Sequence, residues 1–96
     1  MSVLLTMQVG PVDWSKFKSA SEWGYGQKPS GLISGKVYRA EGDQSRVLVV
    51  EEWESHGAWH EFADEVGAEF NLRAGTEGAE WQDTIWVMSD AATYGS

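Results

Sequence analysis

Cysteine is absent from the sequence, and basic residues are scarce: 7 Lys and Arg stand against 15 Asp and Glu, a net charge of −8. The first absence excludes disulfide scaffolds and thiolate metal sites. The second removes the counter-charge for phosphate backbones and anionic membranes, so we expect no nucleic-acid and no membrane partner. No apolar run approaches the roughly 20 residues that cross a bilayer, and the N-terminus lacks signal-peptide features. These absences predict a soluble, cytoplasmic protein.

Tryptophan, by contrast, is plentiful, with six residues in the chain. Such large amphipathic rings suit ligand pockets and interfaces as readily as protein cores. At 96 residues the chain is expected to form one domain, residues 1–96. A core of that size is modest, so dimerisation would add usefully to the buried area.

Hydrophobic periodicity predicts four strands and two helices. The strands are expected at Val3–Val9, Leu32–Arg39, Arg46–Trp53 and Thr84–Met88. Asp13 and Ser55 are each placed to cap a helix, because their side-chain oxygens can accept a first-turn backbone N–H. The glycine-containing segments 22–31 and 73–83 are predicted to be loops.

The helix after Ser55 has the clearest apolar stripe in the chain. Its members recur at helical spacing: Trp59, Phe62, Ala63, Val66 and Phe70. Together with the strands, this gives the order β-α-β-β-α-β, which is typical of the ferredoxin-like α+β fold with a four-stranded antiparallel sheet.

The segment Val47–Val50 is an unbroken apolar run without the alternation of a half-exposed strand. This pattern is typical of a central strand that is buried on both faces. Both helices are expected on one face of the sheet, given right-handed crossovers. The other face needs cover that the chain does not contain, so a homodimer packed through this face is predicted.

The stretch "SGLISGKVYRAEGDQSRVLVVEEWES", Ser30–Ser55, resembles the central part of the antibiotic biosynthesis monooxygenase domains of the dimeric α/β-barrel superfamily. The resemblance lies in a Gly-Leu-x-Ser-x-x-Val-Tyr-Arg strand, a Val-Leu-Val strand, and the Trp-Glu-Ser that opens the second helix. It implies a dimeric α/β barrel with a pocket between the helices and the sheet of each subunit. It also implies oxygenation of polycyclic phenols or quinols without flavin or metal. The superfamily further includes haem degraders, isomerases and proteins without an assigned activity.

Five aromatic residues form the predicted substrate-binding set, because this pocket would be lined from both helices and the adjoining strands. They are Trp14, Phe17, Trp53, Trp59 and Phe62. Each also has a purely structural interpretation, since large aromatic side chains dominate core packing. Trp53, for example, could stack on an aromatic ligand or simply fill the end of the core.

Three polar residues are the predicted catalytic set. His60 is favoured as a general base because histidine titrates near neutrality. The alternative is an exposed histidine, since it lies about 100° around the helix from Trp59. Tyr38 and Gln8 could hydrogen-bond a substrate oxygen, and both could equally be strand residues that face water.

A metal or haem site is not expected. His56, His60 and Asp64 have the i, i+4, i+8 spacing of a helical metal site, but no further ligands accompany them. The haem-degrading relatives use an asparagine near the first strand and a tryptophan and a histidine on the second helix. The matching helical positions hold Phe62 and Leu72, and the first strand has no asparagine. We therefore expect no cofactor.

The acidic residues Glu51, Glu52 and Glu54 are expected to form a solvated patch. Catalysis by one of these carboxylates would require it to be buried against a neighbour.

The leading hypothesis is a cofactor-independent monooxygenase that acts on a small aromatic or polyketide-type quinol or anthrone. The alternatives are a non-catalytic module of the same fold, which binds a small molecule or dimerises, and an isomerase or lyase of the superfamily, in which a base moves a proton without oxygen. The expected partners are a small aromatic ligand and a second copy of the chain.

Overall fold

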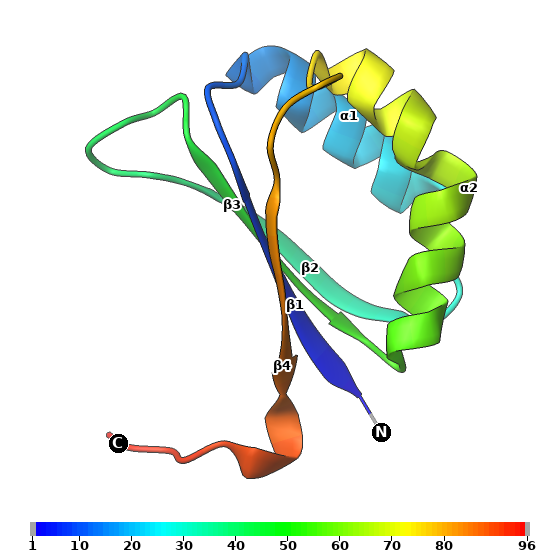
Figure 1. Cartoon of the computed structure of the whole chain (residues 1–96), viewed down its shortest axis with the longest axis vertical. Coiled ribbons are helices and arrows are strands. Elements are labelled where there is room, and N and C mark those ends of the chain that lie inside the picture. Colours follow the sequence, from blue (N-terminus) through cyan, green and yellow to red (C-terminus); the bar gives the residue numbers. More distant parts are fainter. Residues whose placement is uncertain (1, 96) are drawn as a thin grey trace.

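The computed structural model describes residues 2–95 as four strands, two α-helices and a short 3₁₀ helix (Figure 1). In chain order they are β1 (Val3–Val9), α1 (Trp14–Gly26), β2 (Leu32–Arg39), β3 (Val47–Trp53), α2 (His56–Ala74), β4 (Gln82–Val87) and η1 (Met88–Asp90). The predicted β-α-β-β-α-β order and the ferredoxin-like α+β fold are thus confirmed.

The strands form one antiparallel sheet in the order β2-β3-β1-β4, with β1 and β3 in the centre. Both helices lie on the same face of this sheet (Figure 1). The register places Leu5 of β1 between Glu51 of β3 and Ile85 of β4. Two residues further along β1, Met7 lies between Val49 of β3 and Asp83 of β4. These two rows of side chains point toward the helices.

The central strand β3 alternates strictly in burial, although its sequence does not alternate in polarity. Every second residue from Val47 to Trp53 is buried beneath the helices, and Leu48 and Val50 on the opposite face are partly exposed. Large side chains of the edge strands, including Tyr38 and Trp86, are also exposed. We call this surface, which no helix covers, the open face.

Helix α1 begins as predicted but extends further than expected. Asp13 caps it, accepting a hydrogen bond from the Lys16 backbone N–H at 3.1 Å. The expectation of a loop from residue 22 was wrong, because the helix continues to Gly26. Gly24 does not break it: this glycine is buried, and a Cβ there would meet Phe70 and Phe62 of α2 at 3.8 and 4.0 Å. A Cβ at these distances would be in ordinary van der Waals contact, and Gly24 lies within the helix where α1 faces α2.

Helix α2 has the predicted N-cap, with the Ala58 backbone N–H donating to Ser55 Oγ at 3.1 Å. It ends at Gly75, whose φ of 72° is the left-handed conformation that glycine adopts readily. The boundaries predicted after it were slightly wrong, since the helix reaches Ala74 and β4 starts at Gln82. No helix within residues 2–95 is long and apolar enough to cross a membrane.

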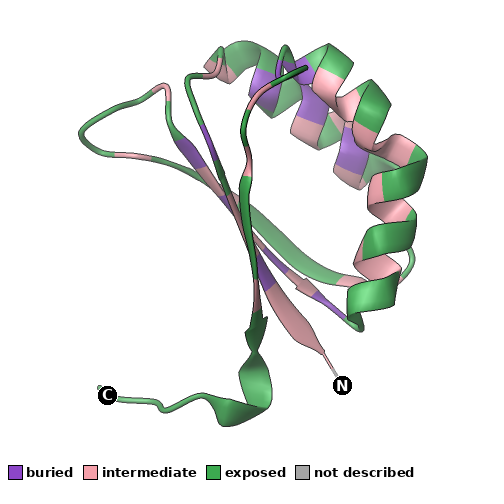
Figure 2. Ribbon diagram, viewed as in Figure 1, coloured by how far each residue is buried: buried purple, intermediate pink, exposed green. Residues whose placement is uncertain are grey.

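The hydrophobic core lies between α1 and the helix-facing side of the sheet (Figure 2). Its buried cluster consists of Val9, Phe17, Ala20, Val47, Val49 and Ala74. Trp53 is completely buried and packs on Phe62, with ring centroids 5.5 Å apart. Only Ala74 of α2 is fully buried, so the apolar stripe of this helix lacks the close packing of a core helix.

Candidate active site

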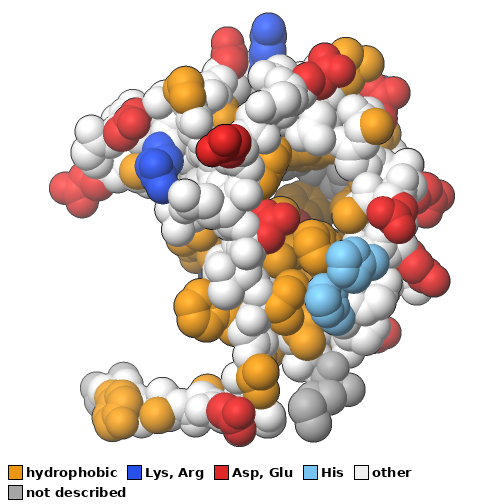
Figure 3. Space-filling model, viewed as in Figure 1, with side chains coloured by type: hydrophobic (Ala, Val, Ile, Leu, Met, Phe, Trp, Pro, Cys, Tyr) orange, Lys and Arg blue, Asp and Glu red, His pale blue; other side chains and the backbone are white. Residues whose placement is uncertain are grey.

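A cavity of about 410 Å³ lies between the two helices and the sheet, within the size range of small-molecule sites. Its lining residues are Met7, Ser21, Gly24, Tyr25, Val49, Glu51, Trp59, Phe62, Ala63, Val66, Gly67, Ala68, Phe70, Asn71, Trp81 and Asp83. The space-filling view shows a hollow on one face of the molecule, bordered by hydrophobic side chains, with the two histidines nearby (Figure 3). The cavity is where the family resemblance implied a pocket.

Aromatic side chains make up much of the cavity wall. Tyr25 comes from α1, Trp81 precedes β4, and the predicted stripe of α2 supplies the rest, including Trp59, Phe62 and Phe70. The stripe is thus the inward face of the helix, as its spacing predicted. Its residues are only partly buried because they border this space.

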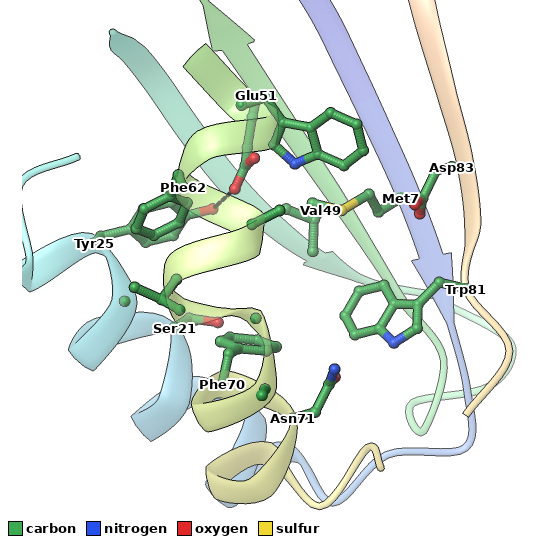
Figure 4. Close-up of a pocket in the computed structure, with 16 residues that line it drawn as sticks. Met7, Ser21, Tyr25, Val49, Glu51, Phe62, Phe70, Asn71, Trp81 and Asp83 are labelled. Atoms are coloured by element: carbon green, nitrogen blue, oxygen red, sulfur yellow. Dashed lines mark hydrogen bonds between the residues drawn. The ribbon is translucent and has the colours of Figure 1, made fainter. Parts of the chain in front are cut away.

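Glu51 is the buried polar centre of the cavity wall, with 5% of its surface exposed. The Tyr25 hydroxyl donates to Glu51 Oε2 at 2.6 Å, and the Trp53 indole N–H donates to Glu51 Oε1 at 2.9 Å. Figure 4 shows Tyr25 reaching from α1 toward the carboxylate on β3. Both carboxylate oxygens therefore have a donor, an arrangement that suits the ionised form.

Burial raises the pKa of Glu51 above its ordinary value, while the hydrogen bonds from Tyr25 and Trp53 act in the opposite direction. Burial, the charge of Glu51 and the hydrogen bond to it raise the pKa of Tyr25 far above its ordinary value. The pair therefore consists of a carboxylate with increased basicity and a hydroxyl that strongly resists deprotonation.

The sheet leaves room for Tyr25 at one position, Gly35 of β2. A Cβ on Gly35 would lie 2.9 Å from both Cζ and the hydroxyl oxygen of Tyr25, which is closer than ordinary side-chain contacts allow. Gly35 pairs with Glu51 in the β2–β3 register. The absence of a side chain on β2 therefore lets the Tyr25 ring approach the carboxylate.

The other polar residues of the cavity are neutral or acidic. Asp83 lies on β4, and its pKa is raised by partial burial. Asn71 accepts a hydrogen bond from Thr76 Oγ1 at 2.7 Å. No lysine, arginine or histidine is among the lining residues. The cavity is thus mostly apolar, with two carboxyl groups as its only charged side chains.

The predicted substrate-binding residues are distributed over four places. Trp59 and Phe62 line the cavity. Trp53 lies behind the wall and contacts it through Glu51 and Phe62. Phe17 is in the core, edge-on to Phe70. Trp14 lies beneath the Arg39 guanidinium, 4.9 Å from ring centroid to Cζ.

The three predicted catalytic residues do not line the cavity. His60 is exposed on α2, with its ring centroid 4.7 Å from that of Trp59. Tyr38 and Gln8 lie on the open face, since the register aligns both with Leu48. Gln8 Oε1 accepts a hydrogen bond from Arg46 there. Their catalytic roles stay predictions.

Sequence reasoning missed Tyr25 and Glu51. Tyr25 was assigned to a loop because of the glycines around it, and Glu51 to a solvated patch because two other acidic residues are nearby. The expectation for Glu51 was wrong. Strand alternation could have corrected it, since Glu51 shares the face of Val47 and Val49. Within residues 2–95, no group of three or more His, Cys, Asp or Glu side chains is arranged to hold a metal ion.

No protein-family profile matches the chain, and no curated protein is similar to it in sequence. Solved structures are similar in fold. The chain is similar to SnoaB, a cofactor-independent oxygenase from Streptomyces nogalater, with a TM-score of 0.75, 11% identity, and coverage of 97% of this chain and 95% of that one.

Two further structures are provisionally assigned as antibiotic biosynthesis monooxygenases. The protein from Nitrosomonas europaea has a TM-score of 0.70 and 12% identity, and the match covers 94% of each chain. The protein from Deinococcus radiodurans has a TM-score of 0.66 and 12% identity, and the match covers the full length of both. The chain thus has the ferredoxin-like fold of the antibiotic biosynthesis monooxygenase-type structures, which is the fold that its sequence resemblance implied.

Proposed function

We propose that the protein is a cofactor-independent monooxygenase that binds a small phenol, quinol or anthrone in the cavity. The observation that carries this proposal is the Tyr25–Glu51 hydrogen bond in an aromatic-walled cavity. Aromatic walls suit an aromatic ligand, and the buried pair suits removal of a proton from its hydroxyl group. The cofactor-independent activity of SnoaB, a protein of the same fold, supports the same kind of reaction.

Proton removal runs through Tyr25 to Glu51. The Tyr25 hydroxyl already donates to Glu51, so its oxygen has a lone pair free to accept the substrate proton. As that proton arrives, the Tyr25 proton moves to Glu51. The raised pKa of Tyr25 makes a standing tyrosinate unfavourable, so the two transfers occur together. The result is a substrate anion and a neutral Glu51.

The substrate anion supplies the electrons for dioxygen. One electron passes to O₂, and the two radicals combine to form a carbon–oxygen bond and, after protonation, a hydroperoxide. Loss of water then breaks the oxygen–oxygen bond and leaves a carbonyl group. One oxygen atom ends in the product and the other in water. The apolar wall favours this sequence because it keeps bulk water from the anion and the hydroperoxide.

Oxygen uptake by the purified protein with a panel of hydroquinones and anthrones tests this function. We expect Glu51→Gln and Tyr25→Phe each to lower kcat/KM about 100-fold, since both interrupt the proton transfer. Glu52→Gln is the matched control, because Glu52 follows Glu51 on β3 but faces the opposite side of the sheet. Circular dichroism establishes that each variant is folded.

His60→Ala belongs in the same assay, because the sequence predicts His60 as the base. Loss of uptake in His60→Ala with full activity in Glu51→Gln would assign the base to the histidine instead. Saturable ligand binding without oxygen uptake would favour the non-catalytic binding module. Substrate conversion without oxygen uptake would favour an isomerase or lyase.

We also propose that the protein is a cytoplasmic homodimer whose open faces pack together. The exposed Tyr38 and Trp86 side chains and the partly exposed Leu48 and Val50 support the proposal, because no helix covers these apolar side chains on the open face. The cavity lies on the opposite side of the sheet, so dimerisation leaves it accessible.

A further inference from the structure

We infer that the cavity selects phenolic ligands that carry a protonated amine and rejects ligands that carry a carboxylate. This inference deepens the proposed function and rests on the cavity being a phenol-binding site. Its basis is the charge of the lining. Glu51 and Asp83 are the charged side chains of the cavity, and both are acidic. An anionic ligand would meet two carboxyl groups, and none of the lining residues is a lysine, arginine or histidine.

The two carboxyl groups are far enough apart to contact different ends of one ligand. Glu51 is on β3 and Asp83 on β4, with β1 between them, and they belong to neighbouring rows of the sheet register. Two strand spacings and a two-residue offset place their Cα atoms about 12 Å apart. Figure 4 shows Asp83 and Tyr25 on opposite sides of the cavity.

The two ends differ in chemistry. Glu51 is buried and already accepts hydrogen bonds from Tyr25 and Trp53, so this end receives a neutral hydroxyl group through Tyr25. Asp83 is exposed at the rim and has no hydrogen-bond or ion-pair partner among the side chains of residues 2–95. A ligand ammonium can therefore contact Asp83 while it keeps part of its hydration, which avoids the cost of burying a bare charge.

The walls reinforce this preference. Trp59 and Trp81 line the cavity, and tryptophan is the aromatic side chain that best attracts a cation. The net charge of −8 adds a long-range field that attracts cations and repels anions. Both effects act in the same direction as Asp83.

Calorimetric titration with three phenols of similar shape tests the inference. Tyramine carries an ammonium, para-propylphenol is neutral, and para-hydroxyphenylacetate carries a carboxylate. At neutral pH and low salt we expect tyramine to bind about tenfold more tightly than para-hydroxyphenylacetate, with para-propylphenol between them. Added salt should reduce the difference in affinity between tyramine and para-hydroxyphenylacetate, because screening weakens the interactions between the ligand charge and the protein.

Asp83→Asn should weaken tyramine binding about threefold, as expected for one exposed charge contact, and leave para-propylphenol unchanged. Glu80→Gln is the matched control, since Glu80 is an exposed acid three residues earlier that does not line the cavity. This comparison separates a local contact from a general change in net charge.

The outcomes distinguish this inference from the proposed function. Equal or tighter binding of para-hydroxyphenylacetate overturns the charge selection and leaves the phenol site intact. An equal effect of Asp83→Asn and Glu80→Gln overturns the role of Asp83. If none of the three phenols binds, the cavity is not a phenol site and both proposals fail. Selective binding without oxygen uptake supports the inference on charge selection and contradicts the proposed oxygenase activity.

Discussion

Under the proposed function, the Glu51 side chain serves a reaction at the expense of stability. Its carboxylate is buried beside apolar side chains, yet it accepts hydrogen bonds from Tyr25 and Trp53. Neutralising the group would remove the desolvation cost, and it would also remove the proposed base. Functional sites characteristically contain such groups with perturbed pKa values.

The stability of the protein should depend on pH through this carboxyl group. Because burial raises the folded-state pKa of Glu51, the folded protein binds the proton more readily than the unfolded chain does. The contribution of Glu51 to stability is fully present at a pH below its ordinary pKa of 4.5. It is lost as the pH rises through the raised pKa of the folded state. The glutamine of the Glu51→Gln variant cannot ionise, so this variant does not lose stability in this way. We therefore expect the wild type to lose stability relative to Glu51→Gln as the pH rises.

Urea unfolding midpoints of both proteins between pH about 5 and 8 measure this difference. Glu54→Gln is the control, because it removes an exposed carboxyl group three residues from Glu51 and leaves the Tyr25–Glu51 pair in place. A wild type that gains stability over Glu51→Gln as the pH rises would contradict the assignment.

At the scale of elements, the site depends on how closely β2 and α1 approach each other. Gly35→Ala would place a Cβ 2.9 Å from the Tyr25 ring and hydroxyl. The end of a tyrosine side chain can move aside at small cost in stability, but it would then lose its alignment with Glu51. We expect oxygen uptake to fall about tenfold or more while the unfolding midpoint changes little, since small misplacements of catalytic groups are costly.

Gly42→Ala is the matched control, because Gly42 lies in the β2–β3 turn and a Cβ there would meet no atom within 4 Å. Full activity of Gly35→Ala would mean that the position of Tyr25 does not matter. Equal losses in both variants would mean that the effect is not local.

The elements themselves were largely predictable from sequence, and the site was not. The polarity pattern or the strand-favouring residues predicted the strands Val3–Val9 and Leu32–Arg39. The side-chain oxygens of Asp13 and Ser55 cap the two helices, as their chemistry predicts. The end of α1 was missed because glycine signals a break in an isolated helix, whereas here α1 continues through Gly24, where it faces α2, to Gly26. Tyr25 was missed as a direct consequence.

Roles of side chains depend on long-range pairing, which local patterns do not contain. Trp59 and Phe62 reached the cavity because a helical stripe fixes their direction. His60, one position after Trp59, falls outside that stripe. The partnership of Tyr25 with Glu51 joins residues 26 positions apart, and only the folded register brings them together.

At the scale of the whole molecule, the open face predicts association. Trp86 is 51% exposed on this face, where its indole N–H donates to Thr6 Oγ1 at 2.8 Å. We expect light scattering to give the mass of a dimer for the wild type and of a monomer for Trp86→Arg, because a charge in an apolar interface is costly. Leu72→Arg is the control, since Leu72 is 61% exposed on α2, away from this face.

A monomeric wild type would contradict packing of the open face on a second copy. A dimer that persists in Trp86→Arg but dissociates in Leu72→Arg would move the interface to the helices.

Helix α2 contributes only Ala74 to the buried core and turns the rest of its apolar stripe to the cavity. A ligand that fills this space therefore acts as a missing part of the interior and stabilises the folded chain on binding. If the cavity binds the proposed ligand, the residues that recognise it are the same residues through which α2 faces the sheet. Under the proposed function, a substitution that changes which ligand fits this space therefore also changes how α2 packs on the sheet.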